Sequence, residues 1–304
     1  MTEDGSPGHA GRPPGVKLYG LILLMILLWA MNFLVSKIAL REVPPVLLAG
    51  MRTALAGALI LPVYFWRRRL DPVRTSWSRD EFPMLLFLGV VGVALNQFFF
   101  VVGISRTSVA HSAFVIGTTP LLVLALSAAV GHEKLSANKS AGMLVALVGV
   151  SFLNLAPSKS PGATLAGDAL TLMASVCFAV FTVAGKRATE GHGAVAVNTV
   201  AYVGGALVLS PLTVWQAWRF PFAAVSWKAW ACLCYMAVFP SLVCYLIFYY
   251  ALTHISASRL SAFGYLQPLI ATTAAAMILR EPVTATIVVG GAMVLAGVFV
   301  SERR

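Results

Sequence analysis

Long apolar stretches separated by short connectors are the feature of this 304-residue sequence that most limits how the chain folds. Hydrophobic residues make up 59% of the chain and charged residues 11%, against roughly 45–50% and 25% in an ordinary soluble domain. A soluble protein of this size would need more polar surface, so the sequence predicts that lipid surrounds most of the chain. The connectors are too short for a globular domain, which argues against an attached ATPase, kinase or nucleic-acid module.

Ten stretches are long and apolar enough to cross a membrane as helices. Each has 18 to 23 residues, and they cover residues 19–36, 45–66, 83–105, 108–130, 138–156, 166–185, 195–217, 230–252, 257–279 and 283–300. The predicted fold class is therefore an all-α integral membrane protein with ten transmembrane helices. Residues 1–18, which contain Gly, Pro and acidic residues, are expected to form a disordered cytoplasmic tail.

The distribution of basic residues predicts how the helices are oriented. With the N-terminus in the cytoplasm, the inner side receives about twice as many Lys and Arg residues as the outer side. An even number of spans returns the C-terminus to the same side. We therefore expect a multi-pass protein of the cell inner membrane with both termini in the cytoplasm. This placement explains the net charge of +11 without a nucleic-acid partner.

The second half of the chain repeats the first. A shift of 148 residues places region 100–150 on region 248–298 without a gap. Identical pairs include Phe100/Phe248, Ser108/Ser256, Pro120/Pro268, Leu121/Leu269, Glu133/Glu281, Gly142/Gly290, Leu147/Leu295 and Gly149/Gly297. The sequence therefore predicts two five-helix repeats, over residues 19–156 and 166–300. Because five is odd, the second repeat enters the membrane from the opposite side, an arrangement that suits transport by alternating access.

Two prolines stand at equivalent positions near the middle of the fourth and ninth spans. Pro120 and Pro268 each remove one backbone donor and free a carbonyl group, so both helices are expected to kink at matching depths. The functional interpretation is a pair of gating helices hinged around a substrate site. A kink that serves packing alone is the alternative.

Polar and aromatic side chains that lipid would not favour lie at intermediate depth in several spans. They predict an aromatic-walled cavity with a few neutral hydrogen-bonding groups, suited to a small amphipathic or zwitterionic solute. The candidate substrate-binding residues are Trp29, Asn32, Asn96, Phe99, Tyr245, Tyr249, Tyr265 and Gln267. For any single member, a hydrogen bond between helices or aromatic packing is an equally open interpretation.

Arg52 is a further candidate for substrate binding, because it lies seven residues inside the second span. A cation at the centre of a span costs roughly 2.5–3.5 kcal/mol, and less near an end. Arg52 either extends toward the outer headgroups or faces the cavity and attracts a carboxylate or phosphate. Its equivalent in the second repeat is Ala201, so a binding role would involve one half only.

Acidic residues are missing from the middle of every span, so a buried proton relay or a carboxylate sodium site has no obvious ligands. The sequence also lacks a glycine-rich phosphate loop, and its four cysteines are expected to be small core residues. We therefore expect no cofactor, no metal and no enzymatic activity.

Glu133 and Glu281, in the connectors before the fifth and tenth spans, are expected to cap the next helix or form an ion pair at the end of a gate.

A stripe of small residues runs along the fifth and tenth spans. Gly142 and Gly149 are seven residues apart, as are Gly290 and Gly297. Such spacing lets helix backbones approach closely. It predicts tight helix packing, with a homodimer interface as the alternative.

Four segments resemble the EamA-type branch of the drug/metabolite transporter superfamily. They are LLWAMNFLVSKIAL at 27–40, PPVLLAGMRTALAGALILP at 44–62, TSVAHSAFVIGTTPLLVLALSAAVGHEKLS at 107–136 and SASRLSAFGYLQPLIATTAAAMILREPVT at 256–284. The resemblance covers nearly the whole chain after residue 18. It implies ten helices around a central cavity and secondary transport of small metabolites, often the export of amino acids or related compounds.

The sequence thus favours an inner-membrane secondary transporter that exports a small amino-acid-like or amphipathic metabolite. Its expected partners are the small-molecule substrate and the lipid bilayer. An integral-membrane enzyme or lipid-handling protein is the alternative, and it would need reactive groups facing the headgroup layer. A membrane-embedded adaptor, which would carry no solute, is a third interpretation.

Overall fold

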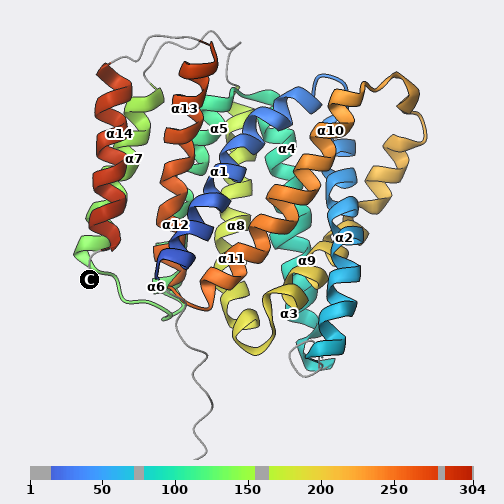
Figure 1. Cartoon of the computed structure of the whole chain (residues 1–304), viewed down its shortest axis with the longest axis horizontal. Coiled ribbons are helices and arrows are strands. Elements are labelled where there is room, and N and C mark those ends of the chain that lie inside the picture. Colours follow the sequence, from blue (N-terminus) through green and yellow to red (C-terminus); the bar gives the residue numbers. More distant parts are fainter. Residues whose placement is uncertain (1–14, 72–78, 155–163, 280–284, 303–304) are drawn as a thin grey trace, which may run out of the picture.

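The computed structural model describes residues 15–71, 79–154, 164–279 and 285–302, and within these ranges the regular structure is helical, without a strand. Figure 1 shows the helices packed side by side into one bundle. Large apolar side chains face outward over much of its surface, among them Leu24, Leu207, Val214, Leu295 and Phe299. An apolar exterior of this extent suits lipid rather than water as the surrounding solvent.

The first half of the chain forms the helices that Figure 1 labels α1 to α7. Their bounds are α1 Gly15–Ala39, α2 Pro45–Leu70, η2 Arg79–Glu81, α3 Phe82–Phe87, η3 Leu88–Leu95, α4 Asn96–Arg106, α5 Val109–Ile116, α6 Thr119–Ala129 and α7 Ala137–Asn154. Residues 15–18 belong to the first turn of α1, so the predicted tail over residues 1–18 extends too far. Residues 1–14 lie outside the described part of the chain.

The second half follows the same order. Its elements are α8 Leu165–Gly191, α9 Ala194–Ala217, η4 Phe222–Ala224, α10 Trp227–Met236, η5 Ala237–Val243, α11 Cys244–Leu252, α12 Ala257–Ala262, η6 Phe263–Tyr265, α13 Leu266–Leu279 and α14 Ala285–Glu302. Seven helical stretches of the described residues are long and apolar enough to cross a membrane, and shorter apolar helices cover 137–152 and 288–301. The chain is therefore an all-α, multi-pass membrane protein.

Two π-helical segments, which the sequence did not predict, interrupt long helices at equivalent places in the two halves. The segment η3 (Leu88–Leu95) joins α3 to α4, and η5 (Ala237–Val243) joins α10 to α11. Their first residues are 149 positions apart, close to the shift that relates the two halves. π-Helical segments are rare and concentrate at functional sites, so this repetition points to the region around them.

The chain also leaves α-helical geometry just before each of the two equivalent prolines. Helix α5 ends at Ile116 and α6 begins at Thr119, so Pro120 lies in the first turn of α6. In the second half, the 3₁₀ turn Phe263–Tyr265 separates α12 from α13, and Pro268 lies in the first turn of α13. A proline near a helix start costs little because the first N–H groups have no partner within the helix. The α-helix is thus interrupted just before each of the two equivalent prolines.

In two pairs of equivalent helices, α1/α8 and α2/α9, the end of one helix lies beside the start of the other. Lys37 Nζ, near the end of α1, donates to the Thr107 carbonyl (2.6 Å), and the Thr107 hydroxyl donates to Asp168 at the start of α8 (2.6 Å). Similarly, the N–H of Leu47 at the start of α2 donates to Gln216 near the end of α9 (2.9 Å). In Figure 1 the beginning of α1 and the end of α14 lie at the same end of the bundle.

The duplicated glycines bring α7 and α14 into direct backbone contact. A Cβ atom on Gly142 would lie 2.5 Å from Ser301 N and 2.6 Å from Gly297 O, and one on Gly297 would lie 2.5 Å from Ala146 N. These distances are shorter than van der Waals contact allows, so no side chain fits there. The stripe predicts close packing correctly. Because this contact lies within one chain, the glycines are not available as the homodimer interface considered as the alternative.

Replacing Gly142 with alanine should destabilise the protein, because the new methyl group must push α7 and α14 apart. We expect the free energy of unfolding to fall by about 1–3 kcal/mol, as for other overpacked cores. Thermal denaturation of the detergent-solubilised protein measures this change. The matched control is Gly20→Ala in α1, where a Cβ atom meets nothing within 4 Å. Equal denaturation temperatures for the two variants would contradict the assigned packing.

Candidate functional site

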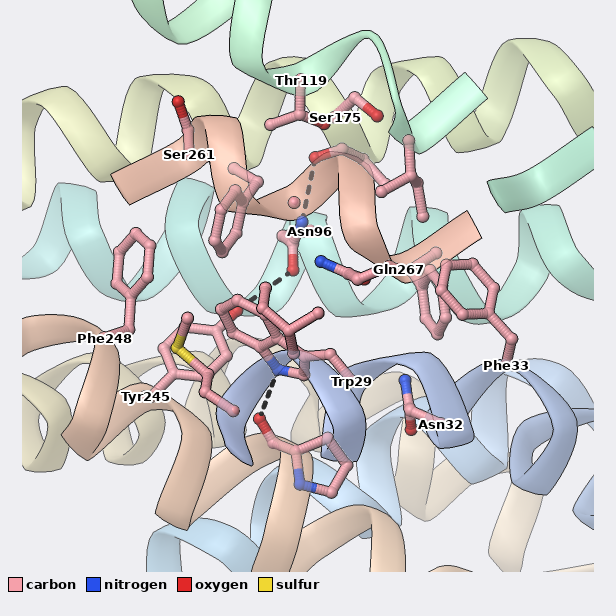
Figure 2. A pocket seen from close by; sticks show the side chains of 18 of the residues that line it. Trp29, Asn32, Phe33, Asn96, Thr119, Ser175, Tyr245, Phe248, Ser261 and Gln267 are labelled. Atoms are coloured by element: carbon pink, nitrogen blue, oxygen red, sulfur yellow. Dashed lines mark hydrogen bonds between the residues drawn. The ribbon is translucent and has the colours of Figure 1, made fainter. Parts of the chain in front are cut away.

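A cavity lies at the centre of the bundle, where helices from both halves meet (Figure 2). Its empty space, including the open mouth, is about 840 Å³. The lining comes from α1, α2, α4, α5, α6, α8, η5, α11, α12, η6 and α13, whereas α7 and α14 contribute none of the described lining residues. The last helix of each half therefore stands outside the site.

Asn96 forms the polar centre of the cavity. Its Nδ2 donates to the Ala174 carbonyl (2.9 Å), which fixes the amide between α4 and α8. Its Oδ1 accepts from Gln97 Nε2 (3.4 Å) and from the Tyr245 hydroxyl (3.5 Å). Figure 2 shows Asn96 and Gln267 turned toward the space that Trp29 and Tyr245 border. The site thus offers neutral amide and phenol groups to a ligand.

One wall of the cavity is a cluster of four aromatic rings. Trp29, Phe178, Tyr245 and Phe248 lie with ring centroids 5.2 to 6.4 Å apart, in edge-to-face and tilted arrangements. Trp29 Nε1 donates to the carbonyl of Pro240 in the π-helical segment η5 (3.1 Å), which fixes the indole. Such packed rings present a firm apolar surface to a ligand.

Arg52 lies inside the bundle and lines the cavity, so it does not extend to the headgroups. Its side chain is 2% exposed, and Nη2 donates to Ser241 Oγ (3.0 Å) and to the Met236 carbonyl (3.4 Å). The Met236 carbonyl also accepts from the Ser241 hydroxyl (2.8 Å), so Arg52, Ser241 and Met236 form one hydrogen-bonded group at the start of η5.

Equivalent positions of the two halves lie around the same cavity. The shift of 149 relates Met25 to Ala174, Ile26 to Ser175 and Trp29 to Phe178, and the shift of 148 relates Phe100 to Phe248, Ile116 to Gly264 and Thr119 to Gln267. Both members of each pair line the cavity. The site is consequently shared between the halves rather than built by one of them.

The structure brings together six of the nine candidate substrate-binding residues and one of the two gating prolines. The residues in the lining are Trp29, Asn32, Arg52, Asn96, Tyr245, Gln267 and Pro120. Phe99 instead packs in a neighbouring apolar cluster, and Tyr249 is buried against Phe181. Tyr265 is buried in a cluster between α7, α13 and α14, and Pro268 is buried outside the lining.

Several lining residues were missed at the level of sequence, although two simple signals point to some of them. The repeat shift, applied to Trp29, gives Phe178, and Gln97 directly follows Asn96 in the chain. Ser175 and Ser261 also border the cavity, but an isolated serine in an apolar helix carries no signal of its own. Phe248 was part of the repeat match without being recognised as a site residue.

At one end of the bundle, the connector after α6 is joined to the start of α12. Glu133 pairs with Lys139 Nζ (2.7 Å) and accepts from the Ser258 backbone N–H (3.1 Å) and the Ser258 hydroxyl. The sequence predicted that Glu133 would cap the next helix or form an ion pair. It forms an ion pair with Lys139 of α7, and the helix whose first turn donates to it is α12 rather than α7. The equivalent Glu281 lies outside the described residues.

These contacts shift the acidity of Glu133. Burial alone would raise the pKa of the carboxyl group, but the hydrogen bonds from Lys139 and Ser258 lower it by more than burial raises it. The net result is a pKa below the ordinary value. The ionised form is therefore the one that holds the two halves together at this end.

Comparison with known families identifies the chain. The model of the EamA-like transporter family matches it twice, over residues 17–155 and 165–302. The chain belongs to the EamA-like transporter family.

Two relatives by sequence are named as transporters or efflux pumps, and one solved structure has a similar fold. An uncharacterized transporter from Archaeoglobus fulgidus is 26% identical over 95% of this chain and 100% of its own length. A probable amino-acid metabolite efflux pump from Salmonella typhimurium is 25% identical over 92% of this chain and 93% of that protein. A solved crystal structure shares the fold, with a TM-score of 0.74 at 18% identity over 94% of this chain and 96% of that chain.

Glu133→Gln should weaken the contact between the connector and α12. We expect the free energy of unfolding at neutral pH to fall by about 1–3 kcal/mol, the range for losing hydrogen bonds to a charged group. Because the folded-state pKa is lowered, the contribution is complete above the unfolded value of about 4.3 and is lost as pH falls through the folded value.

Thermal denaturation of this EamA-family protein between about pH 7 and pH 3 tests the expectation. The difference in denaturation temperature between wild type and Glu133→Gln should be largest at pH 7 and should become smaller in acid. Asp80→Asn, which alters an exposed carboxylate, is the control and should give no such difference. If the difference in denaturation temperature between wild type and Glu133→Gln stayed constant in acid, the ionised carboxylate of Glu133 would not be the stabilising form.

Proposed function

We propose that this chain is a secondary transporter of the cell inner membrane that exports a small amino-acid-like or amphipathic metabolite by alternating access. The observation that carries the proposal is the central cavity, whose lining comes from equivalent positions of both halves. A site shared in this way can be exposed to either side by exchanging the conformations of two similar halves.

The topology that we propose is ten membrane-crossing segments arranged as two inverted five-helix repeats. The antiparallel pairs α1/α8, α2/α9 and α7/α14 support it, because equivalent helices of an inverted repeat must run in opposite directions. The relative positions of the beginning of α1 and the end of α14 also support an even number of crossings. With the basic connectors inside, both termini are cytoplasmic.

We further propose that the interrupted helices are the moving parts. Ile116 and Gly264, at the breaks before the two prolines, both line the cavity. Helix interruptions in membranes are tolerated where they border a cavity or another helix, and they supply backbone carbonyls to a site. Pro120 and Pro268 would act as equivalent hinges, one in each half.

The chemistry of the cavity supports a small amphipathic substrate. The ring cluster offers an apolar wall, while Asn96, Gln97 and Gln267 offer hydrogen-bonding groups. The relative from Salmonella typhimurium, named a probable amino-acid metabolite efflux pump, favours a substrate of the amino-acid type. The named relatives are transporters or efflux pumps, so the comparisons do not favour the lipid-handling or enzymatic alternative.

Alanine substitutions in the cavity should reduce transport. We expect Asn96→Ala and Gln267→Ala each to lower flux into proteoliposomes by about fivefold to tenfold, since one hydrogen bond contributes roughly 1 kcal/mol and 1.4 kcal/mol corresponds to tenfold. The substrate for this assay comes from a screen of metabolite tolerance in cells with and without the protein. Ser210→Ala, on the exposed side of α9, is the matched control.

Unchanged flux in both cavity variants at equal expression would remove these residues from the site. Absence of selective tolerance for any metabolite, together with absence of flux, would favour the adaptor interpretation instead.

The proposed orientation has a separate test. A fluorescent protein that matures only in the cytoplasm should give full fluorescence when it is fused after Arg304. The same reporter inserted at Phe222, in the connector between α9 and α10, should stay dark because that connector is proposed to face outward. The reverse pattern would overturn the orientation.

A further inference from the structure

The cavity contains one charge that the protein itself does not balance. Of the lining residues that the structure describes, Arg52 alone carries a charge, and its side chain is 2% exposed. A guanidinium group keeps its charge at any physiological pH. Burying such a charge is unfavourable unless an anion pairs with it.

The hydrogen bonding of Arg52 is incomplete. Nη2 has two neutral acceptors, the Ser241 hydroxyl and the Met236 carbonyl, but Nε and Nη1 have no partner in the described part of the chain. None of the ion pairs among the described residues includes Arg52. Both nitrogens are buried and the Arg52 side chain borders the cavity, so a ligand that enters the cavity is the candidate acceptor for their N–H groups.

The acidic residues of the sequence are too distant to serve. Within the described ranges they lie in connectors or near helix ends, as do Glu42, Glu133 and Asp168. The lining contains no acidic side chain among the described residues. The cavity consequently has a positive group and no negative one.

The aromatic wall does not provide an alternative site for a cation. The six centroid distances among Trp29, Phe178, Tyr245 and Phe248 are all between 5.2 and 6.4 Å, so the rings contact one another. A cation held in an aromatic cage needs open space within about 6 Å of several ring centres. This cluster instead offers a surface on which an apolar group packs.

We propose that the cavity binds small organic carboxylates with an aromatic or other apolar body. The carboxylate receives hydrogen bonds from Arg52, the body packs on the ring cluster, and a positively charged amino group is not required. This inference rests on the proposed function and narrows its substrate class. A free amino acid fits through its carboxylate, whereas an amine without one does not.

Three related probes separate these features in the purified, full-length protein. They are 3-phenylpropionate, which carries only the carboxylate, phenylalanine, which carries both charges, and phenethylamine, which carries only the amine. Isothermal titration at neutral pH should show binding of the first two and none of the third. Phenethylamine binding without binding of the two acids would overturn the inference while leaving transport itself intact.

The variant Arg52→Gln should weaken binding of 3-phenylpropionate by about ten- to hundredfold, the expected loss for hydrogen bonds to a charged group. Arg52→Lys, which keeps the charge, should retain part of the affinity. Arg68→Gln, an exposed change on the same helix, is the matched control and should bind as wild type does. The thermal denaturation profile of each variant reports whether it is folded.

Other results would also overturn the inference. If wild type binds none of the three probes, the stated substrate class is wrong, and the tolerance screen still decides whether the chain transports another solute. If sodium chloride or sodium phosphate displaces 3-phenylpropionate when the salt and the probe are at equal concentrations, Arg52 binds an inorganic anion instead of a carboxylate. Unchanged binding in folded Arg52→Gln would remove Arg52 from the site.

Discussion

Every backbone N–H and carbonyl group inside a membrane needs a partner, and this constraint governs the rest of the structure. It explains why the described chain is helical and why its departures from α-helical geometry are few. Of those departures, η5 and the two breaks before prolines border one cavity, and η3 ends directly before the lining residue Asn96. The carbonyl of Pro240 binds Trp29, and that of Met236 binds Arg52. Irregular backbone here positions the side chains of the site.

The repeat gives the site its shared character, but the two halves are not chemically equal. Trp29 faces its equivalent Phe178, and Phe100 lies with Phe248 in the lining. Arg52, by contrast, has Ala201 as its equivalent, so the charged side chain occurs in the first half only. The two halves have similar helices, but among the described lining residues only the first half supplies a charged side chain to the cavity. A ligand with one polar end therefore has a preferred direction in the cavity.

Much of the fold follows from the sequence, because hydropathy and the duplicated residues are direct signals of membrane helices. The sequence also indicated that the helices depart from regular geometry near Pro120 and Pro268 and that helices pack closely at Gly142. The π-helical segments were not predicted, since no residue type marks them. Phe99, Tyr249 and Tyr265 were expected in the cavity because depth along a helix is readable from sequence. Which face of the helix meets the cavity depends on helix rotation, which is set by packing.

The contact between α7 and α14 restricts the motions open to the bundle. Because Gly142 and Gly297 lie backbone to backbone, sliding one helix along the other would move each glycine off the backbone that it faces and bring a side chain of the same helix face, such as that of Ala146, into its place. The close contact therefore favours α7 and α14 staying together as one unit in the proposed transport cycle, while the helices that line the cavity rearrange beside them.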